Sequence, residues 1–339
     1  MKGLLLFLAT RRLAYRLIMG SDVLRGMALR FVAGERLDDG VTVAQALAMQ
    51  RLRTTLDYLG ENVTREAEAR AASGAYLGAL RALHAAGLEP NVSLKLTQMG
   101  LDLSERLCFE NTWRVVELAT QLDGFVRLDM ESSAYTQRTL DLFWQFWERS
   151  HAVGVVLQAY LRRTAADVEA MIAAGARVRL CKGAYLEPPT VAYQSRAEVD
   201  ASYARLMERL LLAGTRPALA THDERLLRHA LRFARAQGLP AERFEVQMLY
   251  GVRRDLQLRL AGLGYGVRVY VPYGESWYPY LMRRLAERPA NLTFMLSSLL
   301  AERRAAGESA TRRGWGRGTD AADDRDAAGP LLPRRRLRP

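Results

Sequence analysis

The chain has 339 residues, 49% of them hydrophobic, and a formal net charge of +12. This length and apolar content fit one enzyme-sized barrel with a large core. Two cysteines, Cys108 and Cys181, exclude a disulfide framework and favour a reducing, intracellular compartment. The excess positive charge attracts anions in general and does not select among acidic substrates, phosphates, membranes and nucleic acids.

The first 45 residues are expected to form a helical arm. The apolar run Gly3–Ala9 is too short to span a membrane, and Arg11 and Arg12 interrupt it in a way that a signal peptide does not allow. Leu4–Phe31 therefore predicts one or two amphipathic helices. These would pack against the body of the protein or lie on a membrane surface, and the sequence leaves both open.

Eight short β-like runs alternate with helical segments over residues 46–302. The runs are Arg53–Gly60, Val92–Leu96, Val126–Glu131, Val155–Tyr160, Arg177–Cys181, Ala218–Thr221, Glu245–Leu249 and Val267–Val271. Apolar periodicity predicts helices between and beside them, namely Ala44–Leu52, Arg65–Ala86, Asn111–Leu122, Thr136–Ser150, Ala165–Ala174, Val199–Ala213, Glu224–Gln237 and Arg253–Leu260. This alternation predicts an α/β protein with a (βα)8 barrel.

Polar or charged residues end most of these runs. A strand that is buried on both faces is usually almost wholly apolar, so each such residue needs a partner, a ligand or a water-filled mouth. Because strand ends converge on one face of a barrel, the polar residues together predict a single site there.

The C-terminal segment, residues 303–339, differs in kind. It contains ten arginines and five acidic residues, which accounts for +5 of the net charge, and it has almost no apolar periodicity. Such a composition cannot bury enough surface to offset its ordering entropy, so we expect a disordered tail.

Thr164-Ala165-Ala166-Asp167 predicts a capping box at the start of the helix Ala165–Ala174.

Three segments indicate chemistry. Arg179–Tyr185 is a strand that ends in two cations and a glycine turn, Arg268–Glu287 carries Arg283 and Arg284, and Asp57–Glu61 places a carboxylate past the first strand. Gly183 would let backbone approach a ligand closely, and guanidinium groups match carboxylates. Each segment also has a purely structural interpretation: pairing with barrel carboxylates, a solvated helix face, or an acidic cap on the next helix.

The order of several motifs resembles the monofunctional bacterial proline dehydrogenases over roughly residues 29–300. The motifs are Leu-Gly-Glu (Leu59–Glu61), Ser-Leu-Lys-Leu (Ser93–Leu96), Arg-Leu-Asp-Met-Glu (Arg127–Glu131), Leu-Gln-Ala-Tyr (Leu157–Tyr160), Arg-Leu-Cys-Lys-Gly-Ala-Tyr (Arg179–Tyr185), Ala-Thr-His-Asp (Ala220–Asp223), Gln-Met-Leu-Tyr-Gly-Val (Gln247–Val252) and Tyr-Leu-Met-Arg-Arg-Leu (Tyr280–Leu285). The resemblance implies a distorted (βα)8 TIM-like barrel whose last helix sits over the mouth. It also implies oxidation of L-proline to Δ1-pyrroline-5-carboxylate by hydride transfer to non-covalently bound FAD.

The resemblance also assigns roles to residues. Arg179 is expected beside the reactive flavin nitrogen and Asp129 is expected to orient the cations, so these two are the candidate catalytic residues. The expected cofactor-binding residues are Met130, Gln158, Arg179, Lys182, Gly183, Ala184, Thr221 and His222. The expected substrate-binding residues are Lys95, Tyr270, Tyr280, Arg283 and Arg284, and Glu61 is the expected gate that pairs with one of these arginines.

The resemblance further implies a quinone as the electron acceptor and proline catabolism to glutamate as the pathway. We expect a cytoplasmic protein, with peripheral contact at the inner face of the cell membrane as an open question, and no nucleic-acid partner. No second histidine lies near a strand end beside His222, so we expect no metal. Two alternatives remain from the residues alone: a barrel aldolase or lyase with Lys95 or Lys182 as a Schiff-base lysine, and a non-catalytic basic scaffold.

Overall fold

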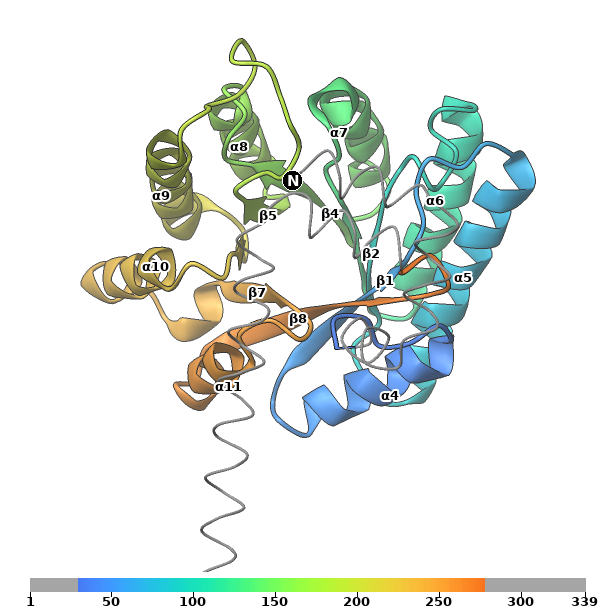
Figure 1. Cartoon of the computed structure of the whole chain (residues 1–339), viewed down its shortest axis with the longest axis horizontal. Coiled ribbons are helices and arrows are strands. Elements are labelled where there is room, and N and C mark those ends of the chain that lie inside the picture. The colour runs from blue at the N-terminus through green and yellow to red at the C-terminus, as the bar shows by residue number, and fades with distance from the viewer. Residues whose placement is uncertain (1–29, 278–339) are drawn as a thin grey trace, which may run out of the picture. The chain divides into compact units, whose positions relative to one another are not determined.

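The computed structural model describes residues 30–277, which lie within one compact unit of the chain. Eight parallel strands of these residues close into a barrel in sequence order, and helices surround them (Figure 1). The expected (βα)8 fold is therefore confirmed. The N-terminal arm before Arg30 and the expected helix over the mouth lie outside the described residues.

The strands alternate with helices along the chain. The strands are β1 (Arg53–Tyr58), β2 (Asn91–Leu94), β3 (Phe125–Leu128), β4 (Val153–Gln158), β5 (Arg177–Cys181), β6 (Ala218–Ala220), β7 (Glu245–Leu249) and β8 (Gly266–Tyr273). The helices are α4 (Leu37–Ala48), α5 (Glu66–Ala85), α6 (Glu105–Gln121), α7 (Ser133–Trp147), α8 (Thr164–Ala173), α9 (Arg196–Ala213), α10 (Glu224–Ala236) and α11 (Arg254–Gly262), with a 3-10 turn at Ala241–Arg243.

The barrel closes by pairing β1 with β8, from Arg53 opposite Arg268 to Tyr58 opposite Tyr273. Helix α4 packs against both of these strands. The expected boundary between the N-terminal arm and the barrel, between residues 45 and 46, falls inside this helix. The apolar side chains of the strands and of the facing helix stripes form one continuous core. This core holds the strand ends that carry the polar groups in a fixed arrangement.

Several strands end earlier than the sequence suggested. Strands β2 and β3 end at Leu94 and Leu128, so Lys95 and Asp129 follow them rather than ending them. Likewise Thr221 follows β6. The hydrogen-bonded pairing between strands stops near the barrel mouth. The residues beyond that point continue the β-like run in the sequence but are not part of the sheet.

Two helix starts were expected six or seven residues too late, at Asn111 and Ala44. Helix α6 begins at Glu105, where the Ser104 hydroxyl accepts a hydrogen bond from the Leu107 N–H, and α4 begins at Leu37. The first turns of these helices carry polar or glycine residues that dilute the apolar period, so periodicity detected only their later turns.

The expected capping box at Thr164 is wrong. Helix α8 follows Arg163, and the Thr164 hydroxyl instead donates to the carbonyl oxygen of Gln158 at 2.6 Å. Asp167 accepts from the Arg163 guanidinium at 2.9 Å rather than from the backbone of the cap. Here tertiary packing against the end of β4 replaces the local cap.

Candidate active site

Asp129 is the centre of a polar cluster at the barrel mouth. Its Oδ1 accepts from the Arg179 guanidinium at 2.9 Å, and its Oδ2 accepts from the Tyr270 hydroxyl at 2.7 Å. The Lys95 ammonium lies 3.6 Å from Oδ2. Three residues that were expected at the site, one directly after β2, one in β5 and one in β8, thus meet around the carboxylate that follows β3. Their chemical roles remain predictions.

Arg179 is held on both sides. One terminal nitrogen binds Asp129, and the other donates to the Ser93 hydroxyl at 2.8 Å. The guanidinium carbon lies 5.3 Å from the centre of the Tyr270 ring, and Arg179 is only 5% exposed. A planar cation with two fixed hydrogen bonds has little freedom to rotate, so its charge is aimed in one direction.

Asp57 is a member of this cluster to which sequence reasoning gave no role. It is fully buried in β1, and its Oδ1 lies 3.4 Å from the Lys95 ammonium. The signal was present, because a carboxylate in the middle of a buried strand needs a charged partner as much as Lys95 does. The sequence analysis assigned the carboxylate of this segment to Glu61 instead.

Lys95 is therefore bracketed by two carboxylates. Burial alone lowers the pKa of Lys95, but the charges of Asp57 and Asp129 outweigh it and raise that pKa above its ordinary value. A Schiff-base lysine needs the opposite shift, because only the neutral amine attacks a carbonyl. Lys182 is also paired, at 2.5 Å with Asp200 and at 3.0 Å with Asp223. The aldolase or lyase alternative is therefore disfavoured.

The turn after β5, Lys182–Ala184, is the part of the chain where the ligand cradle was expected. Gly183 adopts φ +106°, and a Cβ atom there would lie 2.2 Å from Cδ1 of the Tyr160 ring. Only glycine fits this position, because the Tyr160 ring packs against the backbone where a side chain would begin.

Gln158 lies at the end of the neighbouring strand β4 and is 2% exposed. Its amide nitrogen donates to the carbonyl oxygens of Met130 and Glu131 at 3.4 and 3.2 Å, which places Met130 beside it. Its Oε1 has no hydrogen-bond partner among residues 30–277, and the same holds for Nε of Arg179. Buried polar atoms of this kind are usually satisfied, so both atoms are suited to bind a polar ligand.

Thr221 and His222 follow β6 on the same side of the barrel. The Thr221 hydroxyl accepts from the Asp223 N–H at 3.1 Å, and Nε2 of His222 accepts from the Leu249 N–H at 2.9 Å. An accepting Nε2 carries no proton, so this contact orients a neutral His222 ring. Asp223 joins these residues to Lys182.

Glu61 lies half-buried in the loop after β1, close enough to Lys95 to raise its pKa. It does not cap the next helix: α5 follows Arg65, and the carboxylate that bonds the backbone there belongs to Glu68. The helix-capping interpretation of Glu61 is therefore wrong, whereas its expected pairing with Arg283 or Arg284 remains a prediction. Tyr280, Arg283 and Arg284 lie outside the described residues.

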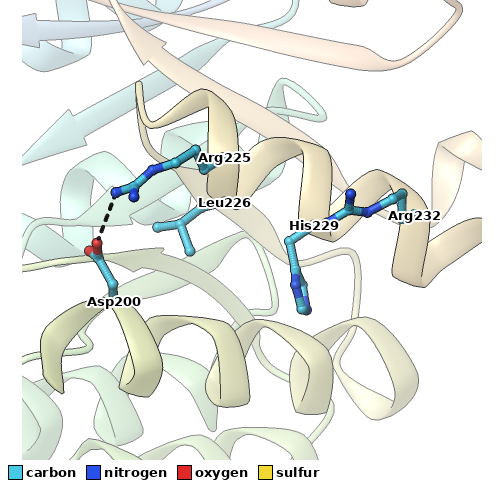
Figure 2. A pocket seen from close by; sticks show the side chains of 5 residues that line it. All are labelled: Asp200, Arg225, Leu226, His229 and Arg232. Atoms are coloured by element: carbon cyan, nitrogen blue, oxygen red, sulfur yellow. Dashed lines mark hydrogen bonds and ion pairs between the residues drawn. The ribbon is translucent and has the colours of Figure 1, made fainter. Parts of the chain in front are cut away.

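A cavity of about 310 Å³ lies between α9 and α10 (Figure 2). Sequence reasoning did not anticipate it. Arg225 reaches across it to Asp200 at 3.5 Å, and Asp200 also binds Lys182, so one end of the cavity adjoins the cradle. The lining is mainly basic and comprises Asp200, Arg225, Leu226, His229 and Arg232.

Comparison with known proteins places this arrangement in a family. The family model described as proline dehydrogenase matches residues 41–297, which include every strand of the barrel. The chain belongs to the proline dehydrogenase family. The family model covers the whole cluster around Asp129 and the cradle at Gly183.

Relatives among characterised bacterial proteins agree. The chain is 42% identical to the proline dehydrogenase of Deinococcus radiodurans over 279 residues, which is 81% of this chain and 90% of that protein. It is 40% identical to proline dehydrogenase 1 of Bacillus subtilis over 273 residues, with 80% and 90% coverage.

A solved structure shares the fold as well. The crystal structure of proline utilization A (PutA) from Bdellovibrio bacteriovorus, inactivated by N-propargylglycine, superposes with a TM-score of 0.72 at 29% identity. The match covers 77% of this chain but only 32% of that one, so this chain spans about a third of the length of that protein.

Proposed function

We propose that this proline dehydrogenase family member oxidises L-proline to Δ1-pyrroline-5-carboxylate, the first step of proline catabolism to glutamate. The observation that carries the proposal is the meeting of Lys95, Arg179 and Tyr270 around Asp129 at the barrel mouth. A zwitterionic substrate needs a cation for its carboxylate and a nearby anion for its amine, and this cluster supplies both.

The substrate carboxylate is assigned to Lys95, together with Arg283 and Arg284 from beyond the described residues. Tyr270 and Tyr280 are assigned to the walls of the slot for the ring. Asp129 orients Arg179, Tyr270 and Lys95, and so it acts on the reaction by fixing three groups at once. Glu61 is assigned to close the site over the bound substrate.

FAD is the proposed cofactor, and the residues present fit it. The buried Oε1 of Gln158 and Nε of Arg179 lack hydrogen-bond partners among the described residues, so both can bond the polar edge of a cofactor. When bound, FAD supplies the hydride acceptor. Arg179 places positive charge beside it, while Met130, Lys182, Ala184, Thr221 and His222 line its proposed path.

A quinone is the proposed electron acceptor, reached by peripheral contact with the inner face of the cell membrane. Support comes from the basic, apolar segment Leu4–Phe31, whose composition suits a helix on a lipid surface. None of the helices described between residues 30 and 277 is both long enough and apolar enough to cross a bilayer. Deleting residues 1–20 should release the protein from liposomes; unchanged partition into lipid would contradict this contact.

The visible spectrum of the purified protein tests the main proposal. A flavin band that bleaches when L-proline is added without oxygen is the expected result, because it reports cofactor, substrate and direction of hydride transfer together. A protein that stays colourless after FAD is supplied, or a flavin that proline leaves oxidised, would overturn the proposal.

A further inference from the structure

The Asp57 carboxylate is the most deeply enclosed charged group at the barrel mouth. It is 0% exposed, and its Oδ1 lies 3.4 Å from both the Lys95 ammonium and the Tyr76 hydroxyl. A contact with Tyr270 also favours the charged form of Asp57. Burying a charged carboxylate costs free energy unless a partner of opposite charge offsets it, and Lys95 is that partner for Asp57.

Barrel topology places Lys95 between two carboxylates. Strand β2 lies between β1 and β3, with Asp57 opposite Ser93 and Leu94 opposite Leu128. Lys95 therefore emerges between Asp57 on one side and Asp129 on the other. Asp129 also binds Arg179 and Tyr270, whereas the only cation that Asp57 contacts within the described residues is Lys95.

We propose that Asp57 is a positioning residue that keeps the Lys95 ammonium charged and aimed at the carboxylate of the substrate. The inference rests on the proposed function, because Lys95 must first be a substrate ligand. Proline has to lose its amine proton before hydride transfer, so activity should rise toward alkaline pH. A buried lysine that loses its own proton in that range would release the substrate it holds.

The charged groups around Lys95 support this role of Asp57. Desolvation opposes its charge, and the acidic groups that favour it are, in order of effect, Asp57, Asp129, Glu61 and Glu131. Tyr76, Tyr270 and Arg179 are the remaining titratable side chains that contact these two aspartates among the described residues. Burial raises the pKa of Asp57, and Lys95 opposes that rise, so each member of the pair stabilises the charge of the other.

The test uses the flavin-loaded enzyme and tetrahydrofuran-2-carboxylate, a proline analogue with oxygen in place of nitrogen. Because this probe has no amine to titrate, the pH dependence of its binding reports protein groups alone. Its dissociation constant is measured from the perturbed flavin spectrum between pH 7 and 9.5. Affinity should be constant for the unaltered enzyme and should fall in Asp57→Asn by up to about tenfold per pH unit once Lys95 deprotonates. A profile for Asp57→Asn as flat as that of the unaltered enzyme would overturn the inference.

Two further variants separate charge from structure. Tyr76→Phe removes a buried hydroxyl 3.4 Å from Asp57 without changing the charge, so it should keep the flat profile even if it lowers the melting temperature. Asp57→Ala leaves room for water beside Lys95 and should reproduce the pH dependence if Asp57→Asn does not fold. A pH dependence in Tyr76→Phe equal to that of Asp57→Asn would mean that packing, not charge, is responsible.

The same preparations distinguish a failure of the proposed role of Asp57 from a failure of the proposed function. With proline as substrate, Asp57→Asn should raise KM at alkaline pH while kcat changes little, since Lys95 binds rather than reacts. An unaltered enzyme that proline bleaches, combined with a flat Asp57→Asn profile, overturns the role of Asp57 alone. An unaltered enzyme that proline does not bleach overturns the proposed function and the inference with it.

Discussion

Gly183 shows how much a single residue determines at this site. Its φ of +106° is disfavoured for any side chain, and a Cβ would sit 2.2 Å from Cδ1 of the Tyr160 ring. Tyr160 is buried and cannot move aside without disturbing the end of β4. The glycine therefore serves the close packing of this turn against the Tyr160 ring rather than chain flexibility.

The substitution Gly183→Ala should cost about 1–3 kcal/mol of stability and leave the purified protein largely free of flavin, because backbone strain and the clash both displace the turn. Urea unfolding and the ratio of flavin to protein absorbance measure the two effects. Gly74→Ala is the control: Gly74 lies inside α5 with nothing within 4 Å of its Cβ position, so alanine there should stabilise by up to about 1 kcal/mol. A flavin-replete Gly183→Ala protein would contradict the cradle.

The charge of Arg179 gives a second prediction. Arg179→Met removes a buried cation from between Asp129 and Ser93 and from the proposed flavin site. The rate of flavin reduction at saturating proline should fall by about 100-fold, as when a preorganised donor is lost elsewhere. Stopped-flow absorbance checks this, with Arg106→Met, an exposed arginine that pairs with Glu110, as the control. A rate within twofold of the unaltered enzyme would remove Arg179 from the catalytic residues.

Elements are positioned here by contacts between them as much as by local signals. Helix α9 has its own capping box, in which Ser195 and Glu198 bond each other's backbone. Helix α8 lacks one, and Thr164 instead ties its first turn to the carbonyl of Gln158 at 2.6 Å. The start of α8 is thus coupled to a residue of the proposed cofactor site.

Thr164→Val should therefore have two effects, whereas Ser195→Ala should have one. Both should lose about 1 kcal/mol in urea unfolding, the first through a buried hydrogen bond and the second through a helix cap. Only Thr164→Val should also weaken FAD binding, because it frees the carbonyl of Gln158. Flavin fluorescence titration separates them, and equal FAD affinity in the two variants would contradict the coupling.

The whole barrel is filled by layers of inward side chains at every second strand position. Glu245 and Arg268 lie at its base, at 3.0 Å from each other, and Arg268 also binds Glu89 at 2.9 Å. Arg268 opens a segment that the sequence associated with the substrate, yet two residues further along its strand Tyr270 reaches the mouth. The period of two along a strand separates a structural layer from the site.

The ion pair of Glu245 with Arg268 at the base of the barrel should make the protein less stable at acid pH. Although burial opposes it, Arg268 lowers the pKa of Glu245 to about 2. A depressed carboxylate stabilises the fold above its unfolded pKa and loses that contribution as pH falls, so about 3 kcal/mol should disappear between about pH 5 and pH 2. Glu245→Gln should be less stable at pH 7 and should show a shallower decline over this range in urea unfolding. Parallel pH profiles for the two proteins would exclude Glu245 as the source.

The sequence by itself determined the eight strands and their alternation with helices, because a parallel strand buried on both faces is apolar over a short stretch and the polar residues near its end stand out. It also identified the family, through motifs that keep their order along the chain. Only the tertiary structure decided which polar groups pair. Asp57 became visible as the partner of Lys95, and Thr164 as the partner of Gln158 rather than a cap. Pairing depends on which strands become neighbours when the barrel closes. No local pattern along the chain shows which side chains from different strands will lie within bonding distance.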